Sequence, residues 1–110
     1  GIGSHYRVRA FLANHGTGLE TAAKLLGGWH WAGRVRQLRI DVSNGSLPLR
    51  ACLGQLHALL GLLKLEAVDE PASVEAQCFS DIHPADPRVF EICLLTDHLD
   101  RLLETVAQKV

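Results

Sequence analysis

Hydrophobic and polar residues alternate along several short stretches of the chain. In one of them Leu38, Ile40 and Val42 occupy every second position, with polar residues between them. A period of two is typical of a β-strand that has one buried face. On this basis the sequence predicts strands at residues 6–12, 37–42, 63–67, 74–78 and 88–95.

Three other stretches have the spacing of amphipathic helices. In the first, Thr17 and Glu20 have the spacing of a capping box, and the Gly27-Gly28 pair is expected to end the helix. The second is expected from Pro48 to Leu60, with Gly61 after it. A third is expected from Thr96 or Asp97 to the end of the chain. The predicted apolar faces are Leu19, Ala22, Ala23 and Leu26; Leu49, Cys52, Leu53, Leu56, Leu59 and Leu60; and Leu99, Leu102, Leu103, Val106, Ala107 and Val110.

The predicted elements follow the order β-α-β-α-β-β-α, which indicates an α+β fold. From residue 37 onward the order matches most of the ferredoxin-like pattern, a two-layer sandwich of helices packed on an antiparallel sheet. Residues 6–110 would form this single domain, and residues 1–5 are interpreted as a tag remnant or disordered start. The last strand of the pattern is missing, and the most hydrophobic strand has apolar residues on both faces. We therefore expect a homodimer or a complex with a partner protein.

Composition restricts the partners. The formal net charge is −1 over 110 residues, which argues against nucleic acid and anionic membranes as partners. No apolar run is long enough for a membrane span and no signal peptide is visible, so a cytoplasmic location is expected. The first forty residues are locally basic, and we interpret this as a solvated face, with phosphate or nucleic-acid binding as the alternative. The residues concerned are Arg7, Arg9, Arg34, Arg36 and Arg39.

The sequence shows no catalytic spacing, so we expect neither an enzyme nor a cofactor. The sequence has three cysteines, an odd number, and no two of them have the spacing of a CxxC pair. This indicates reduced thiols rather than a disulfide framework. Asp81, His83 and Asp86 share a loop but lack a fourth ligand at a recognisable spacing, so no metal site is predicted. The alternative is a small enzyme, with Cys78 or Cys93 activated by His83 or His98.

Trp29 and Trp31 flank His30 between glycines, which is the most unusual local composition in the chain. Two tryptophans that flank a histidine could stack on a planar ligand or form a partner-binding surface. The alternative interpretation is that both indoles cover one end of the hydrophobic core.

The turn after the second predicted strand carries a family resemblance. Gly45 and Leu47 occupy the glycine and leucine positions of a turn motif that precedes a helix in one protein family. Asp41 is displaced by one position from the place of the acidic residue in that motif. With the elements around it, residues 37–110 resemble an ACT domain, the amino-acid-sensing module of metabolic enzymes. The resemblance implies an effector bound at a subunit interface, beside Ser43, Asn44, Gly45 and Leu47.

The sequence thus favours a non-catalytic regulatory or oligomerisation module, with a small metabolite such as an amino acid bound at a subunit interface. The alternative is a protein–protein adaptor, one subunit of a heteromeric complex. The small Cys/His enzyme is the third hypothesis.

Overall fold

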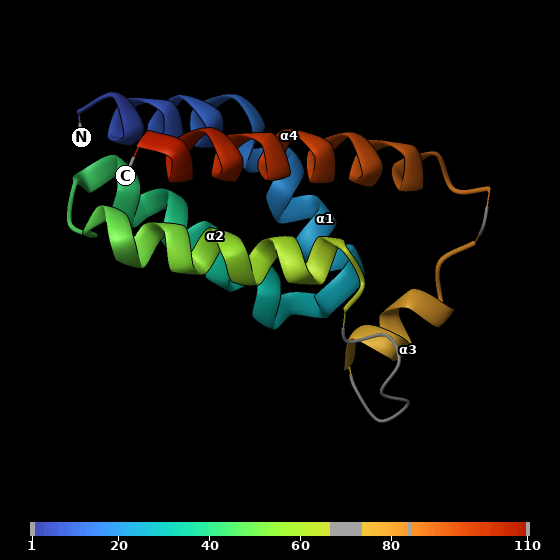
Figure 1. Cartoon of the computed structure of the whole chain (residues 1–110). Coiled ribbons are helices and arrows are strands. Elements are labelled where there is room, and N and C mark those ends of the chain that lie inside the picture. Colours follow the sequence, from blue (N-terminus) through green and yellow to red (C-terminus); the bar gives the residue numbers. More distant parts are fainter. Residues whose placement is uncertain (1, 67–73, 84, 110) are drawn as a thin grey trace.

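The computed structural model describes residues 2–66, 74–83 and 85–109, and it is all-helical over these ranges (Figure 1). The predicted α+β sandwich with a ferredoxin-like sheet is therefore wrong, and so is the resemblance to an ACT domain. Because the described residues form no sheet, an unfilled sheet edge no longer argues for a dimer. The helices are α1 (Ile2–Asn44), α2 (Leu49–Leu63), α3 (Val74–Ser80) and α4 (Pro87–Lys109).

Helix α1 is folded back on itself at Gly28. This glycine has φ 80° and ψ −168°, a backbone conformation almost exclusive to glycine. It divides α1 into a first arm, residues 2–27, and a second arm, residues 29–44. The second arm returns beside the first, and Arg39 Nη2 donates a 3.5 Å hydrogen bond to Thr17 Oγ1 across the hairpin. The glycine pair thus breaks the helix where the sequence predicted a break.

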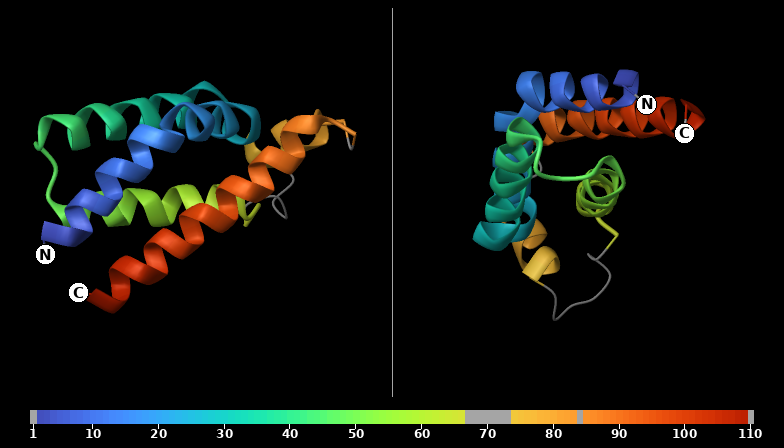
Figure 2. Two further views of the ribbon diagram at one scale, coloured as in Figure 1. Left: turned by 90° about the horizontal axis from the view of Figure 1, so that it is seen from above. Right: turned by 90° about the vertical axis from the view of Figure 1, so that its left-hand side faces the viewer.

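The two arms, α2 and α4 form an antiparallel bundle (Figures 1 and 2). The first described residues of α1 and the last of α4 lie at one end, as does the connection from α1 to α2. The kink at Gly28, the end of α2 and the start of α4 lie at the other, where the short helix α3 packs against α1. The bundle is elongated, with principal extents of 41 × 22 × 22 Å.

The first arm shows why alternation misled the prediction. The predicted strand would place Tyr6, Val8, Ala10 and Leu12 on one buried face, but Tyr6 is 73% exposed. The buried positions instead recur every three or four residues along the whole arm, which is a helical period. They are Ser4, Val8, Phe11, Leu12, Gly16, Leu19, Ala22, Ala23, Leu26 and Gly27. Thr17 and Glu20, expected to cap a helix start, lie within the arm, so the capping-box prediction is wrong.

Residues of the second arm and of α4 likewise fit both the period of a strand and the period of a helix. Residues 37–42 alternate, but only Leu38 and Val42 of their apolar residues are buried, together with Ala32 and Val35 at helical spacing. Ile40 is largely exposed. In α4 the predicted strand 88–95 is helical: Ile92 is buried whereas Phe90 and Leu94 point outward. The remaining predicted strands are wrong as well: Leu63 is the last residue of α2, residues 64–66 form the turn after it, and residues 74–78 belong to α3. Ala67 lies outside the described residues.

Two predicted helices are confirmed with different limits. Helix α2 extends past Gly61 to Leu63, and Pro48 is its N-cap residue. The C-terminal helix begins at Pro87, well before the predicted cap at Thr96 or Asp97. Most residues of the predicted apolar faces are buried or packed on the core, although Ala107 is exposed and Val110 lies outside the described residues.

Helices α1 and α2 end in the same backbone motif. At the end of α1, the Gly45 and Ser46 amides donate to the carbonyls of Val42 and Asp41 at 3.2 and 3.0 Å. This is a Schellman motif, which requires a left-handed residue, and Gly45 has φ 70°. At the end of α2 the left-handed residue is Leu65, with φ 61°. There the Leu65 and Glu66 amides donate to the carbonyls of Leu62 and Gly61 at 3.0 and 3.1 Å.

Candidate functional site

A groove of about 1190 Å³ opens between the two arms of α1. We call it the α1 groove. Near the kink the arms are joined by Arg36 and Arg39 of the second arm, which both reach Glu20 of the first. Away from the kink the arms diverge toward the N-terminal end, as Figure 2 shows. The groove lies in this diverging half, between residues 5–14 and residues 36–44.

Each arm contributes a helical stripe to the α1 groove. From the first arm come Tyr6, Arg9, Ala10 and Ala13, and from the second come Arg36, Arg39, Ile40 and Ser43. Both sets have the spacing i, i+3, i+4 and i+7, which places four side chains on one face of a helix. The groove therefore has two helical walls of matching length.

The charged side chains that line the α1 groove are all basic. Arg9, Arg36, Arg39 and His5 line it, and no aspartate or glutamate occurs among the described residues of its lining. Glu20 lies just beyond the groove and balances part of this charge, with its Oε1 3.4 Å from Arg36 Nε and 3.6 Å from Arg39 Nη1. Within the described part of the chain Arg9 forms no ion pair. The groove is therefore suited to an anionic ligand.

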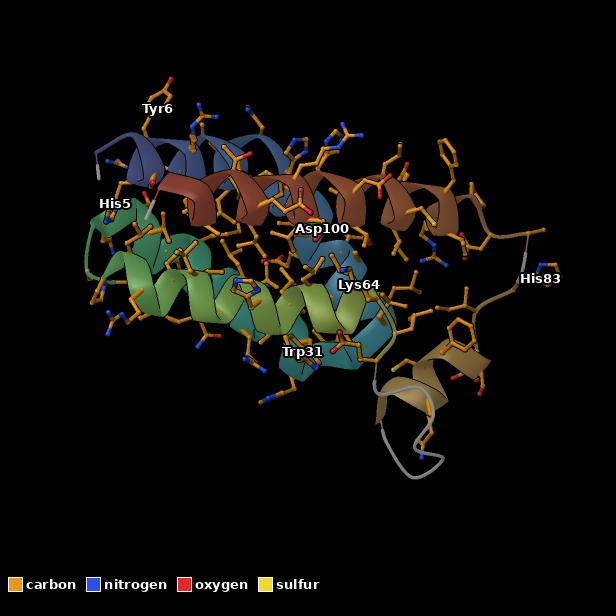
Figure 3. The ribbon with its side chains drawn as sticks, in the orientation of Figure 1. His5, Tyr6, Trp31, Lys64, His83 and Asp100 are labelled. Carbon is orange, nitrogen blue, oxygen red and sulfur yellow. The ribbon has the colours of Figure 1, made fainter. Side chains whose placement is uncertain are left out.

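Two large hydrophobic side chains are exposed at the same groove. Tyr6 on the first arm is 73% exposed and Ile40 on the second is 46% exposed. Figure 3 shows Tyr6 projecting from the first arm away from the bundle, so it forms the rim. Exposed apolar side chains grouped with arginines are characteristic of binding surfaces.

The four residues predicted to bind a ligand are only partly brought together. Ser43 and Asn44 line the α1 groove, whereas Gly45 forms the helix end and Leu47 packs against the core. The amides of Gly45 and Ser46 are bonded to carbonyls of α1, so they are not directed toward a carboxylate. A ligand at this turn would therefore meet the side chains of Ser43 and Asn44 rather than an amide nest.

The two tryptophans have different environments. Trp29, directly after the kink, is 73% exposed, and Lys24 Nζ lies 3.8 Å from its ring centre. Trp31 (Figure 3) is half-buried against the core, and Arg34 Cζ lies 4.1 Å from its ring centre. Neither lines the α1 groove. Trp29 is thus exposed whereas Trp31 packs on the core, and the interface role expected for both stays a prediction.

The alternative of Cys/His chemistry stays a prediction; of the two cysteines named for it, Cys93 is exposed and Cys78 is partly buried. Burial raises the pKa of the Cys52 thiol to about 11, so this cysteine is a poor nucleophile at neutral pH. His83 Nδ1 accepts a hydrogen bond from the Ala85 amide at 3.0 Å, and the ring of His98 stacks on that of His15 with centroids 5.1 Å apart. Both histidines thus already have partners.

The loop expected to be a weak metal candidate is held by an ion pair. The side chain of Arg88 donates hydrogen bonds to the carboxylate of Asp86, and these lower the pKa of Asp86 to about 2. Asp81, His83 and Asp86 do not converge into a potential metal site, and no group of three such ligands occurs in the described ranges.

The groove arginines were not selected from the sequence. Five basic residues of the first forty were interpreted as a solvated strand face, whereas three of them line one groove. A signal was present in the spacing, because Arg36, Arg39 and Ile40 lie on one helical face. It could be recognised only after the segment was known to be a helix.

No helix in the described ranges combines the length and the apolar character needed to cross a bilayer. The chain matches no family model, no curated protein and no solved structure. Function is therefore inferred from the chemistry of the α1 groove itself.

Proposed function

We propose that the protein is a non-catalytic protein-binding module, and that the α1 groove receives an acidic amphipathic helix from a partner protein. The observation that carries the proposal is one groove lined by three arginines and no carboxylate, with Tyr6 and Ile40 exposed beside them. An acidic amphipathic helix offers apolar side chains to Tyr6 and Ile40 and carboxylates to the arginines.

The dimensions of the α1 groove favour a helix over a free metabolite. Each wall is nine or ten residues long, or about 14 Å at the rise of an α-helix, which corresponds to two to three helical turns. Its volume of about 1190 Å³ is larger than the roughly 300–1,000 Å³ of pockets that enclose a small ligand. A free amino acid would leave most of it filled with water.

The composition of the lining favours a protein over a nucleic acid. Apolar Ala10, Leu12, Ala13 and Ile40 lie between the arginines, whereas a backbone-binding surface is a continuous basic patch. The net charge of −1 also gives no long-range attraction for a polyanion.

The direct test is binding of a synthetic peptide. The probe is a fluorescein-labelled amphipathic helix of about four turns, made of Leu, Ala and Glu, and the control peptide has Gln at every Glu position. We expect Arg9→Gln to weaken binding of the acidic peptide roughly fivefold, since it removes a charge at the rim. Arg7→Gln is the matched control, because Arg7 is exposed on the same arm but does not line the groove.

Glu20→Gln should have the opposite effect on the affinity for the acidic peptide. Glu20 neutralises Arg36 and Arg39, so its replacement leaves two groove arginines without their carboxylate and should tighten binding of the acidic peptide. Equal binding of the acidic and the Gln peptide would overturn the proposal. So would equal effects of Arg9→Gln and Arg7→Gln, or tighter binding of a single-stranded oligonucleotide. A concentration-dependent dimer in light scattering that Arg9→Gln dissociates would make a second copy the occupant and would also overturn it.

A further inference from the structure

A second cavity lies at the opposite end of the bundle from the α1 groove, near the kink. Its volume is about 260 Å³, and all four helices contribute apolar side chains to it. Examples are Leu26 of α1, Leu63 of α2, Phe79 of α3 and Ile92 of α4. None of its lining residues belongs to the α1 groove, so a ligand in this second cavity is independent of the proposed function.

The polar atoms of this second cavity are almost all acceptors. Asp97 and Thr96 lie side by side on its wall. The Thr96 hydroxyl already donates to the Ile92 carbonyl at 2.7 Å, so its oxygen can only accept a further hydrogen bond. Among the described residues Asp97 takes part in no ion pair. Among the described side chains that line the cavity, the only other polar group is the Cys93 thiol, which is a weak donor.

We propose that this second cavity binds a small primary amine with an apolar body, of the arylalkylamine class. Its ammonium group would donate to the Asp97 carboxylate and the Thr96 oxygen. Its ring would displace water from the side chains around Phe79 and Ile92. An apolar cavity of about 150 Å³ is enough to hold benzene. The 260 Å³ of this cavity therefore accommodates one ring and a short alkyl chain.

Leu65 has an unfavourable backbone conformation, and its side chain gives the wall of the second cavity part of its shape. The same helix-end motif uses glycine at Gly45 but leucine at Leu65, where a left-handed conformation is unfavourable. The Leu65 side chain lines the second cavity. A glycine would relieve the backbone and would remove part of the wall.

The test compares three ligands of one shape: phenethylamine, 2-phenylethanol and phenylacetate. Cys93 serves as the reporter, because its exposed thiol lines the cavity and bound ligand should slow its alkylation by iodoacetamide. We expect phenethylamine to protect Cys93 and to raise the melting temperature, 2-phenylethanol to do so weakly, and phenylacetate not at all. Alkylation of Cys93 beforehand should abolish the phenethylamine-induced shift.

Two substitutions separate the charge from the shape. Asp97→Asn should weaken phenethylamine roughly tenfold and leave 2-phenylethanol unchanged. The matched control is Asp100→Asn on the same helix, since Asp100 pairs with Lys64 at 3.6 Å and does not line the cavity (Figure 3). Leu65→Gly should weaken all binding to the cavity while the circular dichroism spectrum stays that of the wild type.

Three results would overturn the proposal. The first is protection of Cys93 by phenylacetate as strong as that by phenethylamine. The second is an equal effect of Asp97→Asn and Asp100→Asn on phenethylamine. The third is an absence of protection by phenethylamine at millimolar concentration. None of these outcomes depends on whether a peptide binds the α1 groove, so the two proposals fail separately.

Discussion

Glu20 Oε1 lies 3.4 Å from Arg36 Nε, although the two residues are 16 positions apart in the sequence. Gly28 is midway between them. The pair therefore bridges the two arms of the α1 hairpin. It also partly neutralises one of the arginines that line the α1 groove. The ion pair is partly exposed and by itself contributes at most about 1 kcal/mol, so the hairpin depends mainly on the backbone at Gly28 and on core packing.

Replacement of Gly28 should open this hairpin. Alanine disfavours the observed φ of 80° with ψ of −168°, so Gly28→Ala should cost roughly 1–3 kcal/mol or straighten α1 into one long helix. Helical content should then persist in circular dichroism while the melting temperature falls and light scattering detects larger species. Gly33→Ala is the control, because a Cβ there meets nothing within 4 Å and alanine favours the helix. Equal stability of the two variants would contradict this role of Gly28.

Alanine substitutions at Gly45 and Gly54 together test the turn after α1. A Cβ at either position meets nothing within 4 Å, but Gly45 has φ 70° whereas Gly54 lies within α2. Gly45→Ala should therefore destabilise the protein by about 1 kcal/mol, from backbone strain alone. Gly54→Ala should stabilise it by about 0.5–1 kcal/mol. Urea unfolding of the two variants measures both signs, and effects of the same sign would be inconsistent with a left-handed Gly45.

Leu99 and Leu94 distinguish a helical α4 from the predicted strand. Leu99 is fully buried, so Leu99→Ala should cost roughly 2–5 kcal/mol through lost packing and the cavity it leaves. Leu94 is 44% exposed on the same helix, and Leu94→Ala should cost less than about 1 kcal/mol. If Leu94 were on the buried face of a strand, as alternation predicted, its replacement would be comparably costly. Chemical denaturation of both variants decides between the two structures.

The cysteines should differ in their rates of alkylation. Cys93 is exposed and should react first, whereas Cys52 is buried and its pKa is raised to about 11. At pH 8 the Cys52 thiol is therefore protonated as well as inaccessible, and only the thiolate reacts. Mass spectrometry after timed exposure to iodoacetamide measures each site, and complete unfolding in guanidinium should make Cys52 reactive. Rapid labelling of Cys52 in the native protein would show that α2 is not packed as described.

Part of the fold could be predicted from the sequence because it depends on local spacing. The apolar faces of α2 and of the second half of α4 have a helical period over their whole length, and no alternating pattern competes with it. The glycine pair likewise identified the break in α1. In contrast, residues 37–42 fit both periods, since Leu38 and Val42 are neighbours on a helix and also lie on one side of a strand. The exposure of Ile40, which distinguishes the two, is a tertiary property.

The candidate site could be predicted even less. Ser43 and Asn44 were selected through a resemblance that the fold contradicts, yet they line the α1 groove for another reason, their place on the second arm. Arg9 and Arg36 are 27 positions apart, and no local pattern relates them. Their shared groove results from the return of α1 at Gly28.

The sequence by itself determined where the chain breaks at Gly28 and which faces of α2 and the second half of α4 are apolar. These properties follow from the conformational freedom of glycine and from side-chain spacing, and both act over a few residues. Only the tertiary structure decided that the alternating segments are helical and that the arms of α1 diverge into a groove with one sign of charge. Both depend on contacts between residues distant in the sequence, because burial against the other helices selects one of two periods that the residues fit equally well.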